Sequence, residues 1–333
     1  MGRISTFTTT FALHALNGLC ETSMGVTVNA LENPNNIYVK SVEAMAQIFL
    51  ERSVSIIRSF PKLYPLFPLY WKERSVVKTL HNYTDSVIRS KRKLLEQKGT
   101  TNGTAKNGTM GVKQKLSFLD LMLHEPTMSD ADIREEVDTF MYAGHDTTTA
   151  GIYFTLLELA LNQDIQERLV EEIVSVVGED QLSINHLAQM RYLDMVCKET
   201  LRKYPSIPIV SRELNFDTEI NGSIVPKGTI IMIMIIYIHR NPAVYPDPER
   251  YDPERFNEEN TMTRGPFDYI PFSSGPRNCI GQKYAVMELK STLVKLLQSY
   301  KFKPGNGMTK VEIVGDLVLR PARQLPICIE KRK

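Results

Sequence analysis

The sequence predicts a mainly α-helical fold with a minor amount of antiparallel β-sheet, and two observations support this prediction. Several long segments place apolar residues at helical spacing and contain no proline, including residues 129 to about 161 and the segment that begins at Gln282. By contrast, residues 205–240 and the C-terminal tail hold short apolar runs between turn residues, which is typical of small hairpins.

The N-terminal part, up to about residue 124, is expected to form helices interrupted by loops. Within it, residues 91–111 predict an exposed and flexible connection, because a basic run passes there into a stretch of Gly, Thr and Asn. The long helix that follows has a good N-cap in Ser129 and an acidic residue, Asp132, three positions later. An acidic amphipathic helix is expected at residues 164–177, where Gly178 would end it.

The C-terminal part is predicted to combine further helices with short strands. The helix that contains Glu199 should stop before Pro205, because the residue before a proline disfavours helical backbone. Asn221-Gly222 predicts a two-residue hairpin turn, and the apolar run 230–238, far too short to span a bilayer, predicts a buried strand. The remaining expected elements are a turn at 225–228, a loop-rich stretch at 241–271, and strands near 318–319 and 327–329.

The composition argues against several classes of protein. With 42% hydrophobic and 23% charged residues, the 333-residue chain has the balance of a globular protein, and its net charge of +2 gives no support for nucleic-acid binding. The cysteines are scattered without paired spacing, which fits a reducing compartment and indicates neither a disulfide framework nor a zinc site. They are Cys20, Cys197, Cys279 and Cys328.

The most informative segment is residues 272–281, Phe-Ser-Ser-Gly-Pro-Arg-Asn-Cys-Ile-Gly. Its Gly-Pro pair predicts a tight turn, and helical periodicity begins directly afterwards at Gln282. Cys279 therefore lies near a helix N-terminus, where the helix dipole and free amides favour a thiolate that can bind a soft metal. Arg277 can pair with a carboxylate or a phosphate.

Every fixed position of the pattern Phe-x-x-Gly-x-Arg-x-Cys-x-Gly is filled here, and the segment resembles the haem-binding loop of the cytochrome P450 superfamily. The resemblance implies the cytochrome P450 fold, with Cys279 as the axial thiolate of a haem iron. Phe272 and Arg277 would take part in cofactor binding. A lone cysteine is more often a small buried hydrophobic residue, but the complete ten-residue pattern makes that interpretation the weaker one.

A second motif, Ala143-Gly144-His145-Asp146-Thr147-Thr148, lies inside the long predicted helix. A glycine in mid-helix is costly, so Gly144 predicts either a kink or close packing against something flat. The adjacent acid and alcohol, Asp146 and Thr147, suit the delivery of protons through water to a buried oxygen species. In the resembling family this is the distal helix that crosses the haem face, so Ala143 and Gly144 would lie at the cofactor. The alternative is a polar patch on an ordinary amphipathic helix.

A third motif pairs Glu199 with Arg202, which a helix places on one face. Alone, such a pair is a solvated contact of small energy. In the resembling family this Glu-x-x-Arg pair joins an arginine of a Pro-x-Arg-Phe-like stretch in a buried triad behind the cysteine loop. Arg255, which is followed by Phe256, matches that arginine better than Arg250 in the near repeat before it.

Further expectations follow from the resemblance. Arg212 falls where the family often has a haem-propionate contact, with an ordinary surface or packing role as the alternative. The sequence around Ala143 is similar to that of family-4 enzymes, which are eukaryotic, include numerous insect members and are often fatty-acid ω-hydroxylases. Many of those enzymes have glutamate at this position, whose carboxylate can form an ester to the haem, so Ala143 predicts non-covalently bound haem b. Lys283 and Lys290 are candidates for docking an acidic reductase, with a solvated helix face as the alternative.

The function that the resemblance implies is that of a haem-thiolate monooxygenase, which inserts one oxygen atom from O2 into a lipophilic, fatty-acid-like or xenobiotic substrate. Electrons would come from an NADPH-dependent cytochrome P450 reductase, with cytochrome b5 as a further candidate partner. The full-length protein would lie on the cytosolic face of the endoplasmic reticulum membrane, anchored by a segment absent from this chain.

The first residues of the chain resemble the interior of the family's fold, so residues 1–333 are expected to be a partial catalytic domain, lacking its N-terminal part. Residues 1–128 would supply early helices and the flexible loop, and residues 129–203 the distal haem helix through to the Glu-x-x-Arg helix. Residues 204–333 would supply the β region, the haem-thiolate loop, the proximal helix and the C-terminal strands.

Two alternatives stay open. A thiolate-haem isomerase or dehydratase needs no external electrons, but such enzymes often lose the acid–alcohol pair that Asp146 and Thr147 form here. A non-catalytic haem-binding fragment is the other alternative, since the expected missing part would contribute another propionate-binding helix and substrate-recognition loops.

Overall fold

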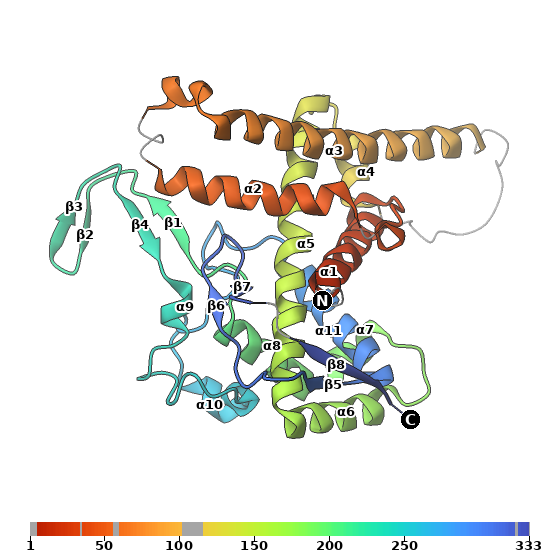
Figure 1. Cartoon of the computed structure of the whole chain (residues 1–333), viewed down its shortest axis with the longest axis vertical. Coiled ribbons are helices and arrows are strands. Elements are labelled where there is room, and N and C mark those ends of the chain that lie inside the picture. Colours follow the sequence, from red (N-terminus) through yellow and green to blue (C-terminus); the bar gives the residue numbers. More distant parts are fainter. Residues whose placement is uncertain (1–4, 34, 56–59, 102–115, 324–325, 333) are drawn as a thin grey trace. The chain divides into compact units, whose positions relative to one another are not determined.

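The computed structural model describes residues 5–33, 35–55, 60–101, 116–323 and 326–332 (Figure 1). Its helices and small antiparallel sheets confirm the predicted fold class. The chain forms two compact units, Met1–Thr149 and Ala150–Lys333, and the boundary between them falls inside the long helix α5 (Asp130–Leu161). Among the described residues, no helix combines the length and the apolar character that a membrane span requires.

The first unit consists of helices around one apolar core, to which Leu16, Val42, Ile88, Val137 and Met141 contribute buried side chains. Helices α2 and α3 lie side by side in this unit (Figure 1). Its elements before α5 are α1 (Ser5–Leu19), the π-helical turn η1 (Cys20–Met24), η2 (Ala30–Glu32), α2 (Ile37–Val54), η4 (Pro61–Leu66), α3 (Pro68–Thr101) and α4 (Phe118–Leu123).

Helix α3 extends further than the sequence predicted. Residues 91–101 belong to this helix and not to a flexible connection, because Lys, Arg, Leu, Glu and Gln are good helix formers. Lys91 is also buried in an ion pair with Asp120, at 2.9 Å, and Arg92 pairs with Asp130. The rest of the predicted connection, residues 102–111, lies outside the described residues.

Helix α5 begins where its predicted N-cap lies. The amide of Asp132 donates to Oγ of Ser129 at 3.2 Å, and the amide of Ser129 donates to the Asp132 carboxylate at 2.8 Å. This reciprocal pair satisfies two amides that the first turn of a helix leaves free. The predicted start is therefore confirmed.

Gly144 in α5 is explained by helix packing. A Cβ atom at this position would lie 2.8 Å from Cδ2 of Leu19, so the missing side chain allows α1 to approach α5 closely. The close neighbour that the glycine predicted is present, but it is an aliphatic side chain and not a flat group. The contacts of Gly144 thus give its predicted role at the cofactor no support.

The second unit combines helices with two-stranded antiparallel sheets, which pair β1 with β4, β2 with β3, β5 with β8 and β6 with β7. Its helical elements after α5 are α6 (Gln163–Val177), α7 (Ile184–Gln189), α8 (Arg191–Lys203), α9 (Ile235–Ile238), η6 (Pro253–Phe256), α10 (Glu258–Met262) and α11 (Gln282–Ser299). Its strands are β1 (Val210–Glu213), β2 (Thr218–Ile220), β3 (Ser223–Val225), β4 (Ile230–Ile233), β5 (Tyr300–Pro304), β6 (Ile313–Val314), β7 (Arg320–Pro321) and β8 (Ile327–Lys331).

Local sequence signals located most of these elements. Helix α8 ends before Pro205 as predicted, and Gly178 ends α6 with a φ of 54°. Asn221 and Gly222, with φ values of 49° and 79°, form the predicted turn between β2 and β3. Both residues adopt the left-handed backbone that a type I′ turn requires.

The apolar run 230–238 is the clearest error of the sequence analysis, because it is not one buried strand. It forms β4 and then turns into α9, where the amide of Ile236 donates to the carbonyl of Pro208 at 3.1 Å. Ile230 and Met232 are 48% and 61% exposed. An apolar run alone does not distinguish a strand from a short helix. The strand predicted at 318–319 is also displaced, since β7 begins at Arg320.

Candidate functional site

The site is built on the loop of residues 272–281, which connects to α11. The amide of Cys279 donates to the carbonyl of Phe272 at 2.9 Å, and the amide of Ser273 donates to that of Ile270 at 3.0 Å. Ser273 and Gly275 have φ values of 61° and 80°, so both adopt left-handed backbone within the loop. These bonds close the loop and present the thiol of Cys279, which is exposed, three residues before the first residue of α11.

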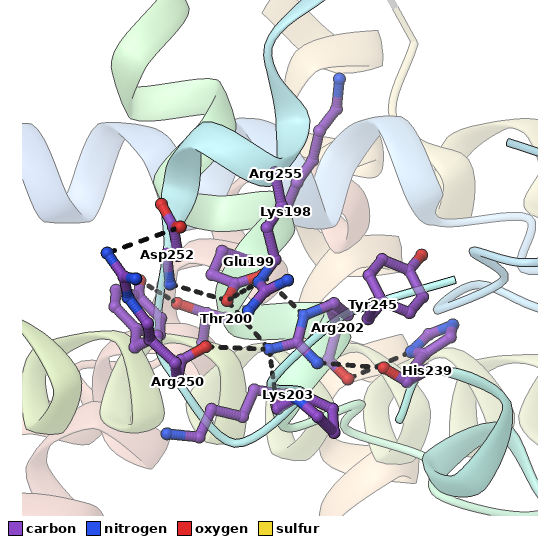
Figure 2. A network of polar contacts seen from close by, with 12 residues as sticks. Lys198, Glu199, Thr200, Arg202, Lys203, His239, Tyr245, Arg250, Asp252 and Arg255 are labelled. Carbon is purple, nitrogen blue, oxygen red and sulfur yellow. Dashed lines mark hydrogen bonds and ion pairs between the residues drawn. The ribbon is translucent and has the colours of Figure 1, made fainter. Parts of the chain in front are cut away.

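The predicted Glu199–Arg202 pair lies at the centre of a buried polar network (Figure 2). Both side chains are fully buried, and the guanidinium donates to the two carboxylate oxygens from Nε at 2.7 Å and from Nη2 at 2.9 Å. Such a bidentate pair is among the strong hydrogen-bonded contacts of proteins. The amide of Asp252 adds a third donor to Glu199, at 2.8 Å.

Arg255, and not Arg250, completes the group around Glu199 (Figure 2). Nε of Arg255 lies 3.6 Å from Oε1 of Glu199, and its side chain is only 10% exposed. Arg250 is 69% exposed and reaches only the carboxylate of Asp252, at 3.9 Å. The structure therefore brings together the three residues that the sequence proposed as a triad.

Electrostatics explain why this network depends on all of its members. Burial raises the pKa of Glu199, while the hydrogen bonds from Arg202 and Asp252 and the charge of Arg255 act in the opposite direction. Taking two charges out of water is expensive unless each finds its partner. Removing any one of these groups is thus expected to lower the free energy of unfolding of the second unit.

Several partners in the network were not anticipated. Arg202 donates from Nη1 to the carbonyl of His239 at 3.0 Å and from Nη2 to that of Pro248 at 2.8 Å. The imidazole of His239 is also fully buried within the network (Figure 2). Backbone acceptors leave no signature in side-chain patterns, and a single histidine between Ile238 and Arg240 gives no specific signal.

Two arginines predicted to face the cofactor lie on or beside the loop. Arg277 is part of the loop itself and is exposed. Arg212 on β1 is half-buried, and its Nη2 lies 3.4 Å from Oγ of Ser273. The structure thus places two cations near the thiol-bearing loop, one of them in contact with it.

The predicted distal residues belong to the first unit. Asp146 is buried, with 4% of its surface exposed, and Thr147 is half-buried. The hydroxyl of Thr147 donates to the carbonyl of Ala143 at 2.8 Å, one helical turn earlier. Ala143 is exposed and lines a cavity of about 340 Å³ together with residues of α2 and α3.

Lys290 is not available for docking a partner, which corrects the sequence analysis. Its Nζ lies 2.7 Å from the carboxylate of Asp194, and its side chain is 12% exposed. Burial opposes ionisation of Asp194, but hydrogen bonds from Lys198 and Lys290 lower its pKa below the ordinary value. Of the two predicted lysines, only Lys283 is exposed.

The residues of the loop fit a haem. Among the described parts of the chain, no group of three His, Cys, Asp or Glu side chains is arranged to hold a metal ion. A single thiol suits haem, which would bring most of the ligands of its iron with it and would need only Cys279 from this loop. Ile280, 85% exposed, offers apolar surface beside Cys279, and Arg277 and Arg212 offer donors for carboxylates.

Comparison with known proteins identifies the family of this chain. The family model described as Cytochrome P450 matches residues 4–328. The relatives include cytochrome P450 4d10 of Drosophila mettleri (39% identical), cytochrome P450 4c3 of Drosophila melanogaster (39%) and human cytochrome P450 4V2 (36%). Each alignment covers 96% of this chain but only 62–64% of the relative, so the chain spans less than two thirds of the length of these proteins. The chain belongs to the cytochrome P450 family, and these relatives group it with family 4.

Proposed function

We propose that this chain binds haem b through the thiolate of Cys279 and belongs to a monooxygenase that inserts one oxygen atom of O2 into a lipophilic substrate. The observation that supports this most strongly is the exposed thiol of Cys279, held on a closed loop directly before α11. When bound, the haem supplies the activation of dioxygen. Family membership and the family-4 relatives support the same reaction class.

The residues of the loop would hold the haem and set the charge around it. Cys279 lies three residues before α11, so the positive end of the helix dipole would face a thiolate that binds the iron. Arg277 and Arg212 would donate to the two propionates and balance their charge, because guanidinium groups suit carboxylates. Phe272 contributes the carbonyl that fixes the amide of Cys279, and its half-buried ring would contact the cofactor.

Asp146 and Thr147 would deliver protons, a role that rests on the family resemblance. The hydroxyl of Thr147 is held by the carbonyl of Ala143, and it can pass a proton on if it rotates away from that acceptor. The adjacent carboxyl of Asp146, which is buried, would replace the proton. A thiolate-haem isomerase would have no use for this relay.

Replacing Thr147 by alanine is expected to uncouple electron use from oxygen insertion. The haem-loaded protein is supplied with a reductase, NADPH, 18O2 and a medium-chain fatty acid. Labelled product should fall roughly 10²-fold, the lower end of what a positioned proton donor contributes, while NADPH oxidation continues. The Thr147→Ser variant retains the hydroxyl and should stay close to the parent. Product without label, or product formed without NADPH, would overturn the monooxygenase proposal.

The haem should be extractable by acidified organic solvent, because Ala143 has no carboxylate that could form an ester with it. The measurement is the haem left on the protein after extraction and denaturing electrophoresis, and none is expected. The Ala143→Glu variant is the matched test, since it should retain part of its haem after turnover. If the parent protein retains haem, non-covalent binding is contradicted. If the Ala143→Glu variant retains no haem, the proposal that residue 143 lies beside the haem is contradicted.

The proposal includes the partners and the location of the protein. Electrons would come from an NADPH-dependent reductase that docks near Lys283, with cytochrome b5 as a second donor. The protein would lie on the cytosolic face of the endoplasmic reticulum membrane. Exposed apolar side chains on η4 and the first turn of α3, among them Leu66 (78% exposed) and Trp71 (63%), lie next to Lys62 and Lys72 and support contact with a lipid surface.

A further inference from the structure

His239 caps the C-terminal end of α9 and is one of the fully buried polar residues of the second unit. Its Nε2 lies 2.8 Å from the amide nitrogen of Ile270, and its Nδ1 lies 3.2 Å from the carbonyl oxygen of Arg202. The ring is stacked on Tyr269, with centroids 5.3 Å apart. The imidazole therefore connects the end of α8 with the backbone segment that leads into the cysteine loop.

The two contacts define the tautomer of the imidazole. An amide N–H can only donate, so Nε2 of His239 accepts from Ile270, and the ring proton lies on Nδ1, which donates to Arg202. Burial lowers the pKa of His239 to about 4, so the ring is neutral near pH 7. A doubly protonated ring would lose the acceptor that Ile270 needs.

A series of hydrogen bonds, joined by short stretches of backbone, runs from Glu199 to Cys279 through this ring. Arg202 holds Glu199 and donates to the carbonyl of His239, whose imidazole returns a bond to the carbonyl of Arg202 (Figure 2). From His239 the series passes to Ile270, whose carbonyl accepts from the amide of Ser273. The residue before Ser273, Phe272, accepts from the amide of Cys279.

The point where the series enters the loop is a strained one. Ser273 has a φ of 61°, a left-handed conformation that residues other than glycine adopt only where the surroundings enforce it. Its amide is bonded to Ile270, and the amide of Ile270 is bonded to His239. Tyr269 and Tyr245 hold the preceding backbone, through bonds to the carbonyls of Lys198 and Asp268 at 3.0 Å each.

We infer that His239 is a positioning residue for the cysteine loop: its neutral imidazole fixes Ile270 against the end of α8 and thereby sets where the loop presents Cys279. Apart from the charge of Arg255, the Glu199–Arg202 pair contacts the backbone of residues 239–252 and not that of the loop. The imidazole of His239 extends this network to the amide of Ile270, three residues before the strained Ser273. This inference rests on the proposed function only in the experiment that measures the spectrum of bound haem.

The test replaces His239 by phenylalanine, which keeps a ring but removes both hydrogen bonds, and by glutamine, which can still donate and accept. Hydrogen–deuterium exchange of the full chain without haem is followed in peptides that cover residues 270–281, α8 and the β5–β8 pair. In His239→Phe the loop amides should exchange about tenfold faster or more, the equivalent of one lost hydrogen bond, while α8 and β5–β8 stay unchanged. His239→Gln should lie between this variant and the parent.

A stability control separates positioning from general weakening. Ile173→Ala leaves a cavity in the buried face of α6 and should accelerate exchange in α6 but not in the loop. Unchanged loop exchange in His239→Phe, equal acceleration throughout the second unit, or a glutamine variant as fast as the phenylalanine one would each overturn the inference.

With haem bound, the His239→Phe protein should show a smaller fraction of the thiolate-type spectrum than the parent, whereas Ile173→Ala should not. An equal thiolate fraction in His239→Phe and the parent would contradict the link to Cys279. If the parent itself shows no thiolate-type spectrum, the proposed function fails, while the exchange data still decide whether His239 positions the loop.

Discussion

Replacing Cys279 by histidine is expected to leave haem bound but to abolish oxygen insertion. The imidazole can still ligate iron, but it lacks the thiolate charge that favours cleavage of the O–O bond. The reduced, carbon-monoxide-bound form should move to the blue-shifted Soret position of non-thiolate haem, and product should fall to the level given by haem in solution. The measurements are the difference spectrum and product per haem.

Cys328 supplies the matched control for this experiment. It is the other exposed cysteine, on β8, and Cys328→Ala should leave both the spectrum and turnover unchanged. Cys20 and Cys197 are poor controls because both are buried in the core, where a substitution would also disturb the packing. Burial raises the pKa of each of these two thiols to about 12. A Cys279→His protein that keeps the red-shifted band would show that another sulfur ligates the iron.

Replacing Glu199 by glutamine should destabilise the second unit by roughly 3–5 kcal/mol, because the buried guanidinium of Arg202 loses its counter-charge. A loss of this size is a large share of the stability of a typical domain, which is about 5–15 kcal/mol. Urea unfolding followed by far-ultraviolet circular dichroism measures it as a lower midpoint at an unchanged slope.

The exposed pair of Arg168 and Glu254 provides the control for burial. It has a short contact of 2.6 Å, but the two side chains are 57% and 43% exposed. Glu254→Gln should therefore cost less than about 1 kcal/mol, since water screens such pairs. Equal effects of the two substitutions would refute the claim that the buried network stabilises this unit.

The features that the sequence predicted correctly depend on residues that are close together in the chain. Ser129 and Asp132 gave the start of α5, Asn221-Gly222 gave a hairpin turn, and the ten-residue pattern around Cys279 located the loop. Each depends on residues close together in the chain, whose backbone preferences and hydrogen bonds act locally. Glu199, Arg202 and Arg255 were found by resemblance, which supplied the long-range contact that spacing alone does not give.

The errors arose where distant residues decide the structure. Asp120 pairs with Lys91 and holds this part of α3 in the core, and Pro208 accepts from Ile236 where the run 230–238 turns into α9. Lys290 turns toward Asp194 and leaves Lys283 alone as the exposed lysine of the pair. The bridge made by His239 was equally invisible, since both of its partners are backbone groups. Tertiary contacts of this kind leave no mark in a local pattern.

The most direct test of the central claim is the reduced, carbon-monoxide-bound difference spectrum of the expressed chain, supplied with haem. The account predicts a Soret band at the red-shifted position of thiolate-ligated haem, and predicts that Cys279→Ala removes it while Cys328→Ala does not. A band at the blue-shifted position, or no haem uptake, would contradict ligation of the iron by Cys279 in this chain.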